Sequence, residues 1–143
     1  MGRKDKVWHY FTIATLSTAT LMFLIYAYMV IFPLTPILEV KSAQILNTKV
    51  MAGDNIQLKA ETCKNHRYSA TVTRRLTNSI IVLLPSIEAN QGLGCKTEVF
   101  SIQIPTEIAP GTYYFSAQFT YEVNQFNTKV YDMKTNTFEV VKE

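Results

Sequence analysis

Two cysteines, Cys63 and Cys95, and one nearby histidine, His66, are the side chains best suited to covalent or metal chemistry in this chain. In an oxidising compartment the cysteines most simply form one disulfide, and closing a loop of about 33 residues stabilises a fold by about 3–4 kcal/mol. In a reducing compartment they stay free thiols. Cys63 and His66 also have a Cys-x-x-His spacing, with Cys95 as a third candidate ligand, but a structural zinc site normally has four ligands and no fourth stands out. We predict the disulfide Cys63–Cys95 and no metal or cofactor.

The rest of the sequence shows no set of residues typical of catalysis. The two histidines, His9 and His66, are not spaced with a Ser or Cys nucleophile and an orienting acid. The sequence has no phosphate-binding glycine loop, no His-Glu-x-x-His motif and no Ser-x-x-Lys motif. Paired carboxylates remain open, because any two acidic residues can meet in space. We predict that the protein is not an enzyme.

Two groups of residues are candidates for binding a partner. Phe126 lies in the segment 124–127 at a predicted strand turn, where it is either an exposed anchor or a plug folded back over the turn. A basic patch would form if the disulfide joins the loops that carry it, and it would suit lipid headgroups, anionic glycans or an acidic protein. The alternative is an ordinary solvated strand face. The basic residues concerned are Lys64, Arg67, Arg74, Arg75 and Lys96.

A long uncharged segment precedes these residues. No Asp, Glu, Lys or Arg occurs between Lys6 and Glu39, and the run 7–32 is mostly apolar. About 26 residues span about 39 Å as a helix, whereas a hydrocarbon core of about 30 Å needs about 20. Aromatic residues gather at both ends of the run, as they do at membrane interfaces. A cleaved signal peptide has a shorter apolar region and a small-residue cleavage site, so we predict an uncleaved signal-anchor.

The charges beside this run predict its orientation. Arg3, Lys4 and Lys6 precede it, against a single Asp5, and basic residues beside a span tend to stay in the cytoplasm. We expect a single-pass protein of the cell (inner) membrane, with its C-terminal part in the periplasm or outside the cell. That part carries 11 basic and 10 acidic residues, so we expect no binding to nucleic acid.

Small residues within the run are spaced for close contact between helices. Ala14 and Thr18, like Thr15 and Ala19, have the small-xxx-small spacing that favours helix association and hence an oligomer. The alternative is that the threonines bond their own preceding carbonyls and face lipid.

Four regions follow from these patterns: a tail (1–6), a transmembrane helix (7–32), a proline-containing linker (33–37) and an exported domain (38–143). Apolar and polar residues alternate through most of the last region, which predicts strands. We expect a bulge or a break near Lys134–Asn136, where the apolar parity shifts. The run Ile80–Leu84, stopped by Pro85, predicts a strand buried on both faces. The other predicted strands are 40–46, 56–62, 69–76, 100–104, 113–123 and 128–141.

Two segments resemble an immunoglobulin-like domain of the bacterial or phage type. Val50–Leu58 contains the hydrophobic–x–x–Gly–Asp–x–hydrophobic pattern that leads into the second strand of such domains. Ile104–Tyr113 is similar to the corner before their sixth strand, where a tyrosine often closes the turn. The resemblance implies an all-β antiparallel sandwich of about seven strands. The cysteines depart from the antibody pattern, because Cys95 precedes Phe100 instead of lying on the sixth strand.

These features predict a non-enzymatic, membrane-anchored interaction module whose exported domain binds a protein partner. One alternative is an accessory or structural subunit of a membrane complex that assembles through the transmembrane helix. Another is a phage-coded envelope protein.

Overall fold

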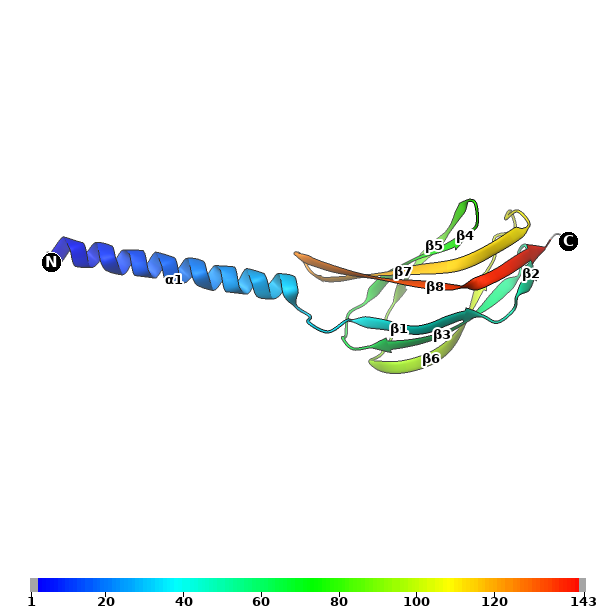
Figure 1. Cartoon of the computed structure of the whole chain (residues 1–143), viewed down its shortest axis with the longest axis horizontal. Helices are drawn as coiled ribbons and strands as arrows, with labels where there is room; N and C mark the ends of the chain where they lie inside the picture. Colours follow the sequence, from blue (N-terminus) through cyan, green and yellow to red (C-terminus); the bar gives the residue numbers. More distant parts are fainter. Residues whose placement is uncertain (1–2, 142–143) are drawn as a thin grey trace.

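The computed structural model describes residues 3–141, and it consists of one long helix followed by an elongated β body (Figure 1). The helix α1 (Arg3–Ile31) ends just before Pro33, which has no amide hydrogen to continue the helical bonding. Its segment Lys6–Ile31 is long and apolar enough to cross a membrane, and none of it is buried against the body.

Eight strands in two sheets make up the body. Three antiparallel strands form the smaller sheet in the order β1-β3-β6, and five form the larger sheet in the order β2-β8-β7-β4-β5. The larger sheet is strongly curled; its strands β7 and β8 run roughly in line with the axis of α1, whereas β4 and β5 are inclined to it (Figure 1). The strands are β1 (Leu38–Ile45), β2 (Lys49–Met51), β3 (Asn55–Lys64), β4 (Ala70–Thr77), β5 (Ile81–Ala89), β6 (Gly94–Gln103), β7 (Gly111–Asn124) and β8 (Asn127–Val141).

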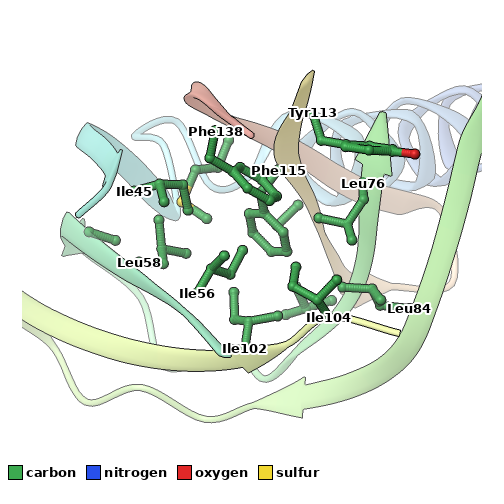
Figure 2. Close-up of a cluster of buried hydrophobic side chains, with 14 of the residues drawn as sticks. Ile45, Ile56, Leu58, Leu76, Leu84, Ile102, Ile104, Tyr113, Phe115 and Phe138 are labelled. Atoms are coloured by element: carbon green, nitrogen blue, oxygen red, sulfur yellow. The ribbon is translucent and has the colours of Figure 1, made fainter. Parts of the chain in front are cut away.

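The core lies between the two sheets, where alternate residues of facing strands meet (Figure 2). Ile56 and Leu58 of β3 are buried on one side, and Phe115 and Phe138 of β7 and β8 on the other. Burying each such side chain contributes about 1.5–3 kcal/mol. Tyr113 is also fully buried, and its hydroxyl donates a hydrogen bond to the Ala109 carbonyl at 2.9 Å.

The turn at Gly53 positions the start of β3. Gly53 has a φ of 89°, which favours glycine, and the Asp54 amide donates to the Met51 carbonyl across the turn at 3.1 Å. The Asp54 carboxylate accepts a bond from the Met51 amide at 3.1 Å. The Gly-Asp pair singled out in the sequence therefore closes this turn.

The expected bulge in the last strand is present. The register between β7 and β8 shifts between the pairs Tyr114↔Thr137 and Ser116↔Lys134, so that Thr135 and Asn136 of β8 lie opposite the single residue Phe115 of β7. Because neither residue has a regular pairing partner on β7, both side chains make other bonds: the Thr135 hydroxyl bonds Phe115 of β7, and the Asn136 amide bonds Ile45 of β1.

The prediction of a β body behind one apolar helix is confirmed, but the finer assignment to the immunoglobulin type is not. The short strand β2, which pairs parallel to β8, was not predicted. The predicted burial of Ile80–Leu84 on both faces is wrong: β5 is an edge strand, and Leu83 is 69% exposed. Nor does Pro85 end this strand, since an edge strand tolerates a residue without an amide donor.

Candidate functional site

The two cysteines lie opposite each other on neighbouring strands and form a disulfide. Cys63 of β3 and Cys95 at the start of β6 are paired in register, and the structure contains the bond between them. The predicted disulfide is confirmed. The zinc alternative fails because both thiols are consumed, and His66 instead bonds the Thr35 hydroxyl at 2.8 Å. Within residues 3–141 no group of three or more His, Cys, Asp or Glu side chains could hold a metal ion.

Lys64 does not belong to a surface patch, contrary to the expectation. Its side chain is buried, and Nζ donates to the Gln91 carbonyl at 2.8 Å and lies 5.8 Å from the centre of the Tyr121 ring. Burial lowers the pKa of the Lys64 amine. The sequence could not show this, because the β5–β6 loop that carries Gln91 is distant along the chain.

The other basic residues are distributed over different parts of the body. Arg67 is exposed on the loop between β3 and β4. Arg75 of β4 pairs with Leu83 of β5 and Ser116 of β7, on the outer face of the larger sheet. Arg74 and Lys96 both line one cleft, so these two alone among the five contribute to a common feature.

The two sheets are held together along the side formed by β1 and β8. The bulged Asn136 accepts a hydrogen bond from the Ile45 amide at 2.6 Å and donates one to the Ile45 carbonyl at 3.3 Å. Near the other end of the same side, the Tyr131 hydroxyl accepts a bond from the Ile37 amide at 2.8 Å. These contacts close this side of the body.

The opposite side is open. Strands β5 and β6 are the free edges of the two sheets, and a cleft of about 530 Å³ lies between them. A second hollow of about 490 Å³ adjoins it and shares Arg74, Ser101 and Ile102. Together they form a groove along β6. Its apolar lining comes from both sheets and includes Leu58, Val72, Ile102, Phe115, Phe119 and Met133.

Charged and apolar groups share the groove. Arg74 and Lys96 balance Glu88 and Glu98, so the lining has no strong net charge. The Arg74 guanidinium donates two bonds to the Pro85 carbonyl, from Nε at 3.0 Å and from Nη2 at 2.7 Å. The groove offers apolar surface with a few polar groups, which is the usual makeup of a ligand-binding site.

Two exposed apolar residues in the groove were not predicted as site residues from the sequence. Ile87 of β5 and Phe100 of β6 are each 45% exposed and line the cleft. The alternation around Phe100 places it on the inward face of its strand, which by itself predicts burial. Only the arrangement of the sheets shows that no strand covers it.

One end of the groove is closed by the β5–β6 loop. The Gln91 side chain hydrogen-bonds the Thr62 hydroxyl, with 3.0 Å between Nε2 and Oγ1. The main-chain carbonyl of Gln91 accepts the bond from Lys64. The buried lysine therefore holds the loop that forms this end wall.

Phe126 lies at the tip of the β7–β8 hairpin and is half exposed. Its ring contacts Tyr26 of α1, with 5.7 Å between the ring centres, and its amide donates to the Asn124 side chain at 2.9 Å. Its role in binding a partner stays a prediction.

Ala14, Thr15, Thr18 and Ala19 lie in the exposed part of α1. The Thr15 hydroxyl bonds the carbonyls of Phe11 and Thr12, and the Thr18 hydroxyl bonds that of Ala14. The threonine hydroxyls are thus hydrogen-bonded within the helix, as the alternative to association predicts. Association through this face stays a prediction.

No family model matches the chain. A search of curated proteins finds no match either. Among solved structures, a β-glucosidase from Erythrobacter marinus matches with a TM-score of 0.41 and 9% identity, over 69% of this chain and 15% of that one. The sporulation control protein Spo0M from Bacillus subtilis matches with a TM-score of 0.39 and 9% identity, over 76% of this chain and 50% of that one. The chain thus spans half or less of these proteins, and likenesses at this level carry no functional argument.

Proposed function

We propose that this protein is a non-enzymatic, membrane-anchored interaction module that binds an extended segment of a partner protein in the groove between β5 and β6. The observation that carries the proposal is the open groove itself, an apolar cleft flanked by two free sheet edges. An extended peptide can add to a free edge through backbone hydrogen bonds while its alternate side chains enter the cleft.

Of the two edges, β6 is better suited to pair with a partner. Pro85 interrupts the middle of β5, whereas the ten residues of β6 contain no proline. Ten residues of strand extend about 33 Å. Phe100 and Ile102 supply apolar contacts, while Lys96 and Glu98 discourage two such edges from pairing with each other.

The proposed location of the module is supported by α1 and the disulfide. Their combination supports retention of α1 in the membrane and export of the body to an oxidising compartment, because disulfides persist there.

Two features of the body favour the immunoglobulin type. One is its division into the separate sheets β1-β3-β6 and β2-β8-β7-β4-β5, and the other is the tyrosine bond at Ala109.

Site-specific photocrosslinking in native membranes tests the groove. A benzoylphenylalanine at position 100 should capture a partner, whereas the same group at Val130, which is 50% exposed and does not line the groove, should not. The capture at position 100 should be lost when Ile87→Asp places a charge in the cleft. It should survive Val99→Asp, since Val99 pairs with Lys59 on the opposite face of β6.

Equal capture from positions 100 and 130, or capture that survives Ile87→Asp, would contradict binding in the groove. Replacing residues 7–32 with a generic poly-leucine helix separates the alternative role as an accessory subunit. Loss of co-purifying partners after that replacement would favour assembly through the helix.

A further inference from the structure

The C-terminal end of α1 is capped by the β7–β8 hairpin, a segment almost 100 residues away along the chain. The Asn124 side chain donates to the Met29 carbonyl at 2.9 Å. The Asn127 side chain donates to the Val30 carbonyl at 3.0 Å and also to that of Phe32. The last carbonyls of a helix have no partner within it, so the hairpin satisfies acceptors that the helix leaves free.

The chain beside the helix cannot provide these donors. Pro33 has no amide hydrogen, and the linker then leads away to β1. A carbonyl without a partner is costly where water is scarce, as at the boundary of a bilayer. Asn127 is only 7% exposed, so its amide is well placed to serve these acceptors.

The tip of the hairpin lies beside the last turns of α1. The Phe126 ring meets the Tyr26 ring edge to face, at an interplanar angle of 69°. Tyr26 precedes the last helical residue, Ile31, by five positions, which corresponds to about 7.5 Å along the helix axis. Phe126 therefore lies at the depth of the aromatic residues that mark this end of the apolar run.

We propose that the β7–β8 hairpin is a second membrane anchor, with Phe126 immersed in the lipid headgroup region and Asn124 and Asn127 locking the hairpin to α1. The partner of this surface is the lipid bilayer, because the tip is continuous with the end of the span and aromatic side chains favour that layer. The inference rests on the proposed retention of α1 in the membrane. The body extends from the end of α1 along the direction of the helix (Figure 1). Fixed in this way, it would stand upright on the bilayer and hold the β5–β6 groove at a constant orientation.

Tryptophan fluorescence in vesicles of phosphatidylethanolamine and phosphatidylglycerol tests the proposal with the full chain. Trp8 is the only tryptophan, so a Trp8→Phe background leaves one reporter placed by Phe126→Trp. Lipids brominated on their acyl chains should quench this reporter, and its emission should shift to the blue. A reporter placed by Val130→Trp, at a site with the same 50% exposure but further up β8, should show neither effect.

A second substitution tests the lock. Asn127→Asp replaces the donor amide with an acceptor that repels the helix carbonyls, so quenching of the reporter at position 126 should fall. Gln125→Ala, an exposed change at the same tip, should leave the quenching intact. A reporter at position 126 that is not quenched, in protein that resists carbonate extraction, overturns the hairpin anchor alone. Protein that carbonate releases from the vesicles overturns the retention of α1 as well.

Discussion

The bulge in β8 offers the sharpest test of how this body is held together. Thr135 is buried, and its hydroxyl accepts a hydrogen bond from the Phe115 amide at 3.1 Å. The same oxygen lies 3.2 Å from the Phe115 carbonyl and 2.9 Å from that of Asn136, to either of which its proton can be donated. The hydroxyl replaces the strand partner that the bulge removes from Phe115.

Thr135→Val keeps the shape of this side chain and deletes its hydrogen bonds. Each buried polar group left without a partner costs about 1–3 kcal/mol, and the added methyl group returns about 0.8 kcal/mol. We expect a net loss of about 2 kcal/mol in the free energy of unfolding. For a body of this size that corresponds to a fall of about 10 °C in Tm.

Urea and thermal unfolding of the full chain in detergent, followed by the circular dichroism of the β-strands, measure this loss. Thr137→Val is the matched control, because Thr137 is an exposed residue of the same strand two positions away. Thr135→Ser should retain most of the stability that Thr135→Val loses, since serine keeps the hydroxyl. A Thr135→Val protein as stable as the Thr137→Val protein would refute the role assigned to the hydroxyl.

Three further predictions concern the disulfide and two buried tyrosines. Replacing Cys63 and Cys95 by serine opens a crosslink of sequence separation 32 and should lower the free energy of unfolding by about 3–4 kcal/mol; an unchanged urea midpoint would argue against this. Tyr113→Phe deletes the bond to Ala109 and should cost about 1 kcal/mol in the same assay, whereas no loss would mean that the bond does not stabilise the corner. Burial, with a smaller repulsion from a neighbouring tyrosine, raises the pKa of Tyr121 from 10.0 to about 12. The unfolded state then loses this proton first, so the contribution is complete below pH 10 and decreases as the pH rises toward 12. Between pH 9 and pH 11 the wild-type chain should lose about 1 kcal/mol relative to Tyr121→Phe, and parallel pH profiles of the two proteins would contradict the shift.

Local patterns in the sequence were sufficient to predict several elements. The uncharged run predicted α1, because an apolar run of that length is typical of a membrane-spanning helix. The parity shift near Lys134–Asn136 predicted the bulge, since a change of parity moves side chains to the other face of a strand. The pair Cys63–Cys95 followed from the number of cysteines and the expected compartment.

Features that depend on distant segments were not accessible in this way. Lys64 was expected on the surface, but a loop that returns from β5 covers it and accepts a hydrogen bond from its amine. The run Ile80–Leu84 was expected to be buried on both faces because its residues are apolar, yet in this edge strand Ile81 and Leu83 are exposed and only Leu84 is buried.

The sequence alone thus determined that this protein has an apolar helix, a body of strands and one disulfide, because each depends on residue type and on spacing along the chain. The tertiary structure alone decided which side of the body is open, since the groove lies where the outer edges of β5 and β6 have no strand beside them. It also decided that Asn124 and Asn127 meet the end of α1. Such contacts join residues far apart in sequence, and no local periodicity records them.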